Sequence, residues 1–334
     1  MAAGPDPKST TSAGPSSGRP RGHLVLYVTA FSALALLGTA CYLFVGPYLE
    51  VRALIKRVHV SGERCALSDA ELARLGGTGQ AARKLGLYAR LPAHLTSNRR
   101  CAVEMLGGCG KDGLPVLETL LQDSDEEVRI CAAHSVMKTH QPSSWRILKE
   151  ALGSSSPSVR LWAAYGLGWL KEARSVDALL LALEKEPVPP VRRDLVLALG
   201  SIGDRRAVGP LISTLEDKDE HVRATAITAL KWLGDPRAWP ALMSRAKDPH
   251  AYVRGSAIST LGEVAYSQAR ELIIAALTTD ADADVRGSAA KALGQSGDRS
   301  ALDPLKTALE DPELVVKAEA ERAIKLIEKR EPPK

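Results

Sequence analysis

A short motif recurs along most of this chain at a nearly constant interval. Seven copies carry a valine followed by a basic residue, and Asn98-Arg99 begins a degenerate first copy. The basic residues are spaced 30, 31, 32, 31, 31, 32 and 31 residues apart, at Arg99, Arg129, Arg160, Arg192, Arg223, Arg254, Arg286 and Lys317. A fixed period of this length is typical of a solenoid, in which each unit packs on its neighbours.

Each unit has the pattern of two helices. Alanine usually follows the basic residue by three positions and a larger apolar residue by seven, as Ala226 and Leu230 do in the fifth unit. These spacings place both residues on one helical face. Glycine ends several of these helices, as at Gly203, and proline often stands in the first turn of the next, as at Pro210. We therefore predict an all-α, right-handed α-solenoid of about eight helical hairpins over residues 81–330.

An acidic residue usually stands six positions before the basic one, in the turn between the two helices of a unit. We expect this carboxylate to cap the second helix and to hold the arginine, forming a structural ladder along the stack. Ser154 replaces the acid before Arg160. The ladder pairs singled out are Asp123 with Arg129, Asp217 with Arg223, Asp248 with Arg254, and Asp280 with Arg286.

These motifs resemble HEAT repeats, especially the short repeats of phycobilisome-lyase-like proteins, over about residues 81–329. The resemblance implies an armadillo-like helical fold that mainly binds partner proteins, with the second helices lining a concave surface. One enzyme that the repeats resemble, deoxyhypusine hydroxylase, binds iron through His-Glu pairs. No His-Glu dipeptide occurs in this chain, so that activity is not expected.

The third unit carries an aromatic stripe. Trp162, Tyr165 and Trp169 are spaced i, i+3 and i+7, so they lie on one side of their helix. Most other units have polar residues at these positions, which argues against a core role, and we expect the stripe to bind a partner in the concave groove. Irregular packing, or coverage by the preceding linker, is the alternative. The residues expected to extend this surface are His134, Leu197 and Trp232.

The N-terminal part has three segments. Residues 1–23 are rich in Pro, Gly, Ser and Thr, and predict a disordered tail. Residues 24–45 are apolar with 22 uncharged positions, about 33 Å as a helix, and predict a transmembrane helix in contact with the lipid bilayer. Residues 46–80 are predicted to be a membrane-proximal linker with a short helix. The basic residues expected to flank the membrane are Arg19, Arg21, Arg52, Lys56 and Arg57, and they leave the orientation of this single-pass protein open.

The leading functional hypothesis is a membrane-anchored scaffold or adaptor without catalysis, metal or cofactor, because no single-copy catalytic set stands out. One alternative is nucleic-acid binding through residues Arg100, Arg193, Lys291, Arg322 and Lys325. Residues 96–334 contain 33 Lys and Arg against 34 Asp and Glu, which argues against it. Another is an enzyme of unrecognised type, such as a bilin-lyase-like protein, with Asp194 as the acid to test.

Overall fold

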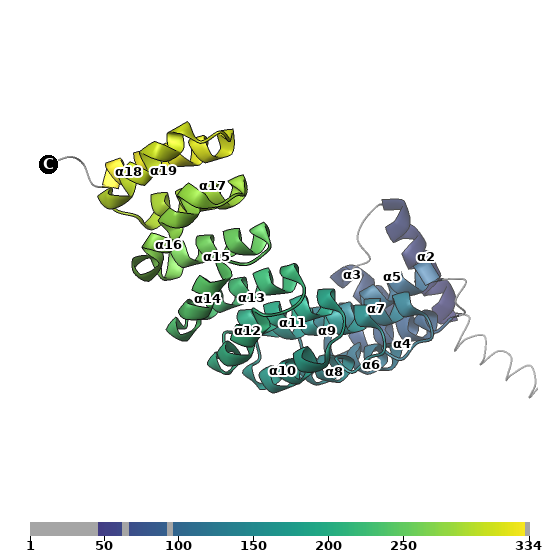
Figure 1. Ribbon diagram of the computed structural model, residues 1–334. Coiled ribbons are helices and arrows are strands. Elements are labelled where there is room, and N and C mark those ends of the chain that lie inside the picture. The colour runs from purple at the N-terminus through teal and green to yellow at the C-terminus, as the bar shows by residue number, and fades with distance from the viewer. Residues whose placement is uncertain (1–45, 62–66, 92–95, 331–334) are drawn as a thin grey trace, which may run out of the picture. The chain divides into compact units, whose positions relative to one another are not determined.

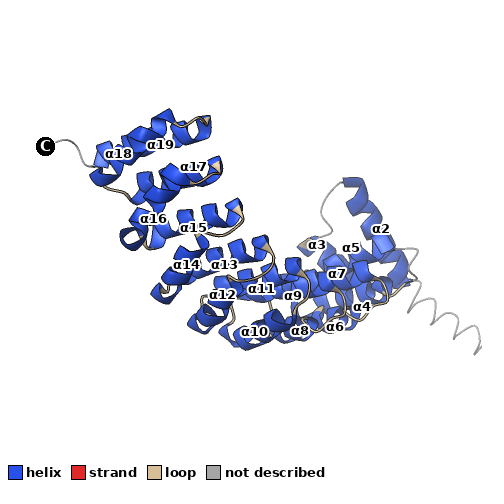
Figure 2. Ribbon diagram, in the orientation of Figure 1, coloured by secondary structure: helices blue, strands red, loops and turns tan. Residues whose placement is uncertain are grey.

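The computed structural model describes residues 46–61, 67–91 and 96–330. The regular elements within these ranges are α-helices and 3₁₀ turns (Figures 1 and 2). The chain divides into two compact units, residues 1–50 and 51–334, and the solenoid lies in the second. The α-helices are α2 (Gly46–Ser61), α3 (Asp69–Leu75), α4 (Thr78–Ala89), α5 (Thr96–Gly107), α6 (Leu114–Leu120), α7 (Glu126–Lys138), α8 (Ser144–Ala151), α9 (Pro157–Leu170), α10 (Val176–Lys185), α11 (Pro189–Ile202), α12 (Val208–Thr214), α13 (Glu220–Leu233), α14 (Trp239–Arg245), α15 (Ala251–Val264), α16 (Tyr266–Thr279), α17 (Ala283–Ser296), α18 (Leu302–Thr307) and α19 (Leu314–Arg330).

Eight hairpins follow one another from α4–α5 to α18–α19, each made of a first and a second helix. The second helices α5, α7, α9, α11, α13, α15, α17 and α19 pack side by side, and each also packs on the first helix of its own hairpin. We call them the second-helix layer, and the remaining helices from α4 onward the first-helix layer. The prediction of an all-α solenoid of helical hairpins is confirmed, whereas its handedness stays a prediction.

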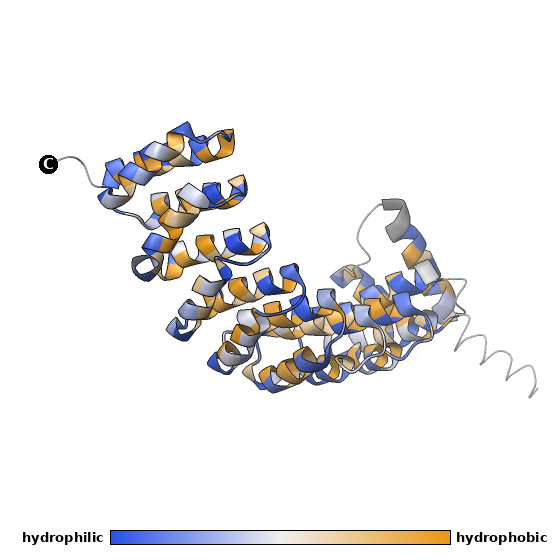
Figure 3. Ribbon diagram, viewed as in Figure 1, coloured by the Kyte–Doolittle hydropathy of each residue, from blue (hydrophilic) through white to orange (hydrophobic). Residues whose placement is uncertain are grey.

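Apolar and polar residues alternate around each helix, as Figure 3 shows. In α13 the buried side includes Val222, Ala226 and Leu230, at the positions that the repeat predicts for the core. Burial of such side chains contributes about 25 cal/mol per Å² of apolar area, which is why the pattern recurs in every unit.

Small residues set the spacing within the second-helix layer. A glycine eight positions after the basic residue faces an alanine six positions after the basic residue of the next unit. A Cβ on Gly168 would lie only 2.7 Å from the Cα of Ala198, so a larger side chain would force the two helices apart. The same contact joins Gly200 to Ala229, Gly262 to Ala292, and Gly294 to Ala323.

Glycine ends second helices in two ways. Gly203 and Gly234 follow α11 and α13 in the left-handed conformation, with φ of 79° and 61°, as the sequence predicts. Gly297 follows α17 with φ of −74°, so its role is different. A Cβ there would lie 2.4 Å from the carbonyl oxygen of Leu293, and glycine is required by this close approach.

The predicted transmembrane segment 24–45 lies outside the described residues, as do Arg19 and Arg21. In the part of the chain that the structure does describe, no helix has the length and apolar character needed to cross a bilayer. The predicted localisation as a single-pass membrane protein has no support from any described helix, and it is withdrawn.

The other predicted membrane-flanking residues lie on α2. Arg52, Lys56 and Arg57 are exposed, while Leu54 and Ile55 on the opposite side are buried. The charges are therefore the solvent side of an amphipathic helix. The next helix, α3, begins at a capping box, in which Ser68 and Glu71 each accept the other's backbone N–H.

Candidate functional site

The basic residues of consecutive units form a ladder with carboxylates. In the pair of Arg223 and Asp248, Nε and Nη2 each donate to one carboxylate oxygen, at 2.9 and 2.8 Å. Arg223 also donates to the carbonyl oxygen of Asp217 at 2.8 Å. Two-point contacts of the same kind join Arg160 to Glu186, Arg192 to Asp217, Arg254 to Asp280, and Arg286 to Asp311.

The direction of these pairs differs from the expectation. Each carboxylate binds the arginine of the preceding unit, while the arginine of its own unit bonds only its backbone carbonyl. The carboxylate is not the N-cap of the second helix either. Asp219 caps α13, and Asp217 accepts the N–H of Asp219 instead. The ladder therefore ties successive units together, a role that an arrangement within one unit could not have.

The ladder is interrupted once. Arg129 donates to the carbonyl oxygens of Asp123 and Ser124, at 2.8 and 3.1 Å. The next unit has Ser154 at the position of the acid, and Arg129 and Ser154 line the same surface hollow. Because the pairing runs forward by one unit, the missing acid affects Arg129 rather than Arg160.

The pairs change the acidity of their carboxyl groups. Burial by itself raises the pKa of Asp248, but hydrogen bonds from Arg223 and from the N–H of His250 outweigh it, and the pKa lies below its ordinary value. Asp217 behaves in the same way with Arg192. The charged form is thus the stable one, as expected for a structural pair.

The aromatic stripe lies on α9, on the solvent side of the second-helix layer. Tyr165 and Trp169 are 47% and 46% exposed, and Trp162 is half-buried. Trp162 lies between His134 of α7 and Tyr165, with ring centroids 4.6 and 5.6 Å away. The rings of Trp169 and His140 meet edge to face, with their centroids 4.9 Å apart. The structure therefore brings together the predicted residues Trp162, Tyr165 and His134.

The other two predicted residues lie on neighbouring helices. Leu197 is half-buried on α11. Trp232 on α13 is 51% exposed, and its ring lies against Gly200 of α11, where a Cβ would come within 3.1 Å of it. The predicted surface therefore spans α7, α9, α11 and α13.

Three residues of this face were not predicted from the sequence. His140 follows α7 in the left-handed conformation with φ of 52°, outside the repeated pattern. Tyr252 is 61% exposed on α15, and its ring lies 5.8 Å from that of His221 on α13. The sequence does carry a signal for His221 and Tyr252, because each stands two positions before the basic residue of its unit.

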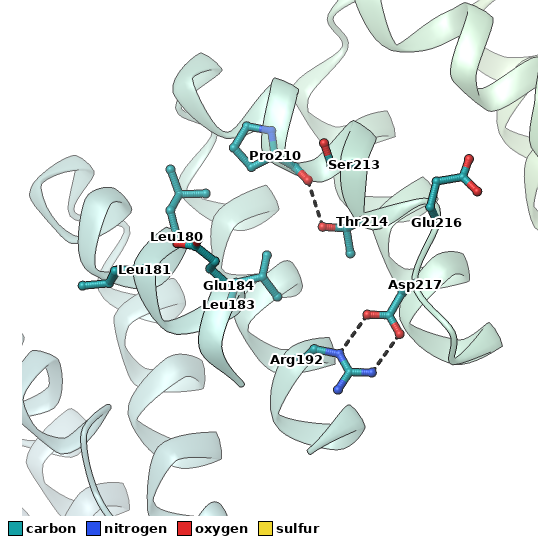
Figure 4. A pocket seen from close by; sticks show the side chains of 10 residues that line it. All are labelled: Leu180, Leu181, Leu183, Glu184, Arg192, Pro210, Ser213, Thr214, Glu216 and Asp217. Carbon is teal, nitrogen blue, oxygen red and sulfur yellow. Dashed lines mark hydrogen bonds and ion pairs between the residues drawn. The ribbon is translucent and has the colours of Figure 1, made fainter. Parts of the chain in front are cut away.

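The first-helix layer has two apolar grooves on either side of α10. One, of about 560 Å³, lies between α10 and α12 and is lined by leucines of α10, with the pair of Arg192 and Asp217 at its end (Figure 4). The other, of about 770 Å³, lies between α8 and α10. The exposed Leu181 borders both. Four of the five residues from 179 to 183 are leucine, more than one buried helix face requires. This excess is a sequence signal for an exposed apolar surface on α10.

The residues of the alternative functions are placed as follows. Asp194 is half-buried on α11, and burial raises its pKa against the opposing charge of Arg193. Arg100 pairs with Glu127 at 3.3 Å, and Arg322 pairs with Glu319 at 2.7 Å. These carboxylates offset charges that nucleic-acid binding would need. In the described ranges no three His, Cys, Asp or Glu residues are grouped to hold a metal ion.

Comparison with known proteins gives matches to the model of the HEAT repeats. The matches overlap and cover residues 87–168, 141–200, 176–259 and 239–325. Together they include most of the hairpins described above. Two solved structures share the fold. The chain is 13% identical to Kap95p in its complex with RanGDP, with a TM-score of 0.59 over 94% of this chain and 54% of that one. It is 20% identical to the E. coli protein YibA, with a TM-score of 0.52 over 78% and 93%.

Several curated proteins are similar to parts of this chain. The chain is 45% identical over 83 residues to phycocyanobilin lyase subunit alpha of Nostoc sp., covering 22% of this chain and 30% of that protein. It is 35% identical over 105 residues to the bilin biosynthesis protein PecE of Mastigocladus laminosus, covering 29% and 39%. It is also 31% identical over 151 residues to an uncharacterised phycocyanin operon protein of Pseudanabaena tenuis, covering 42% and 74%.

The chain thus spans about a third of the length of the first two relatives. Their names, a lyase subunit and a bilin biosynthesis protein, contradict the prediction that this protein is not an enzyme, and that prediction is withdrawn. The matched repeats run through more than two thirds of the chain, from residue 87 to residue 325. The chain therefore belongs to the HEAT-repeat family.

Proposed function

We propose that this protein binds a partner protein on its second-helix layer, with Trp162, Tyr165 and Trp169 as the anchor of the contact. The exposure of these rings carries the proposal, since Tyr165 and Trp169 are nearly half exposed on a folded surface. Tryptophan and tyrosine are the side chains that most often dominate the energy of protein interfaces. A large exposed aromatic group also costs solubility unless a partner covers it.

The geometry supports this role because the rings are already held in place. Trp162 is packed between His134 and Tyr165, and Trp169 is packed against His140. Rings restrained in the free protein lose little side-chain entropy on binding. A partner with a complementary apolar surface would therefore gain most of the contact energy as affinity.

The test is affinity capture from a lysate of the source organism, followed by calorimetry with the partner that wild type retains. The triple variant Trp162→Ala, Tyr165→Ala, Trp169→Ala should weaken binding by at least about 100-fold, because each anchor contributes on the order of 2 kcal/mol. Trp145→Ala is the matched control, since Trp145 lies on α8 in the first-helix layer against Arg174.

Helical content and melting temperature must first be shown to be similar in the variants. Loss of the partner from the triple variant but not from Trp145→Ala supports the proposal. If the triple variant retains its partner with unchanged affinity, the aromatic stripe is not the binding anchor.

A second function is favoured by the similarity to phycocyanobilin lyase subunit alpha. We propose that the same surface binds an open-chain tetrapyrrole as part of a lyase-type assembly. Such a chromophore is flat and conjugated. It can stack on the ring of Trp162 and meet Tyr165 edge to face, because these two rings lie at 85° to each other. Asp194 stands on α11 at the position that Trp162 has on α9, two after the basic residue. Burial raises its pKa, which suits a group that exchanges a proton with the ligand.

Titration with phycocyanobilin tests this second function. Binding is measured by the absorbance of the chromophore and by the quenching of tryptophan fluorescence. Binding should be lost in Trp162→Ala and kept in Trp145→Ala. Asp194→Asn should keep the binding but change the pH dependence of the chromophore absorbance. Equal binding by the Trp162 and Trp145 variants would exclude stacking on this stripe, and leave the protein-binding proposal unaffected.

A further inference from the structure

At the junction between α13 and α15 the second-helix layer lacks the close contact of a glycine with an alanine. At four other junctions a glycine meets an alanine across the gap. Here the corresponding positions hold Lys231 and Thr260, both larger. Both residues line a hollow of about 560 Å³ formed by α13, α15 and α17, which we call the α15 hollow. The hollow therefore begins where the close contact is missing.

Small side chains deepen the α15 hollow. Gly255, Ser256 and Ser259 on α15 stand one, two and five positions after Arg254. In α9 the same positions hold Leu161, Trp162 and Tyr165. The surface that projects aromatic rings in the third unit is thus recessed in the sixth. Ser288 of α17 lines the same recess.

An aromatic ring stands at the edge of the α15 hollow. Tyr252 lines it and is 61% exposed. Along the layer it stands in one row with His221 before it and Asp284 after it, each two positions before the basic residue of its unit. The face of a tyrosine ring attracts a cation within about 6 Å of its centre.

The charges and hydroxyls of the α15 hollow favour a cationic donor. Asp282 and Asp284 line it, and its one lining cation among the described residues, Lys231, is held by Glu263 at 3.0 Å. Ser256 donates its hydroxyl hydrogen to a carbonyl oxygen of its own helix at 2.8 Å. Its oxygen therefore faces a ligand as an acceptor, which suits a group with several N–H donors.

We infer that the α15 hollow receives an arginine or lysine side chain of the partner protein, between the ring of Tyr252 and the carboxylate of Asp284. The inference rests on the proposed binding of a partner to the second-helix layer, and it specifies the chemistry of that partner. The partner would place apolar groups on the stripe of α9 and a basic residue further along the layer.

The test uses two short peptides that differ only in charge, acetyl-glycyl-arginyl-glycinamide and the same peptide with neutral citrulline. Binding is followed by the NMR amide shifts of Gly255, Ser256 and Ser288 in the full chain. The arginine peptide should bind at least about fivefold more tightly than the citrulline peptide, on the order of one partly exposed cation–π contact or ion pair. Asp284→Asn and Tyr252→Ala should each remove about this factor.

Asp303→Asn is the matched control, because Asp303 is likewise an acid in the first turn of a helix, α18, but lies outside the α15 hollow. It should leave peptide binding unchanged. The inference is overturned if arginine and citrulline peptides bind equally, or if Asp303→Asn weakens binding as much as Asp284→Asn.

The triple variant of the α9 stripe separates this inference from the proposed function. It should bind the arginine peptide like wild type, because the peptide has no group for the stripe. If the triple variant loses the partner while the two peptides bind equally, the inference about the α15 hollow is overturned and the proposed function is not. Retention of the partner by the triple variant would overturn the proposed function, whatever the peptides show.

Discussion

At the scale of the residue, Ser154 shows how one side chain affects a neighbouring unit. Its hydroxyl accepts the N–H of Ser156 at 3.3 Å, so the turn before α9 keeps the form that an aspartate gives it elsewhere. A serine has no charge to offer Arg129, whose position corresponds to arginines that bind a carboxylate of the next unit. The ladder is therefore weaker between the second and third units.

Ser154→Asp should restore that pair and stabilise the protein. The gain is expected to be about 0.5–1 kcal/mol, since part of the attraction is offset by desolvation, and the melting temperature should rise by about 1–3 °C. Thermal denaturation followed by circular dichroism measures it. Ser154→Asn is the control, because asparagine has the shape of aspartate without its charge. A rise no larger than that of the control would show that Arg129 does not gain a partner.

At the scale of the element, α9 has a separate role on each face. Val159, Ala163 and Leu167 are buried and hold the helix in the core. Gly168 lets α11 approach closely. The remaining face carries the aromatic stripe. Helices such as α15 keep the first face unchanged and replace the third by small residues, so one repeated scaffold can offer a protruding or a recessed surface.

At the scale of the whole molecule, the ladder makes stability depend on acid. The pKa of Glu186, Asp217, Asp248 and Asp280 is lowered because hydrogen bonds from the arginines outweigh burial, and the pKa of Asp311 is lowered mainly by Arg286. Carboxyl groups with a lower pKa in the folded state stabilise it fully above their unfolded pKa of about 4. This contribution is lost as the pH falls through the lowered values.

The melting temperature should therefore stay nearly constant from about pH 7 to pH 5 and fall between about pH 4 and pH 3. Circular dichroism at a series of pH values and constant ionic strength measures this. A melting temperature that does not change down to pH 3 would mean that the ladder carboxylates are no more stable as anions in the folded state than in the unfolded one.

The sequence by itself determined the solenoid, its hairpins and the buried positions. A constant period with apolar residues at helical spacing leaves one way to bury them, which is to stack each unit on the next. It also indicated that the stripe of Trp162, Tyr165 and Trp169 is outside the core, because other units have polar residues there. These conclusions follow from the pattern within one unit and from comparison of the same position in different units.

Only the tertiary structure decided what depends on the register between neighbouring units. The stacking of one hairpin on the next pairs the carboxylate of Asp248 with Arg223 rather than with Arg254, and places Trp162 beside His134. It also leaves the α15 hollow at the junction of Lys231 and Thr260. The physical reason is that the distances between units are set by the packing of small residues such as Gly168 and Ala198. The period alone does not predict which side chains of neighbouring units then contact each other.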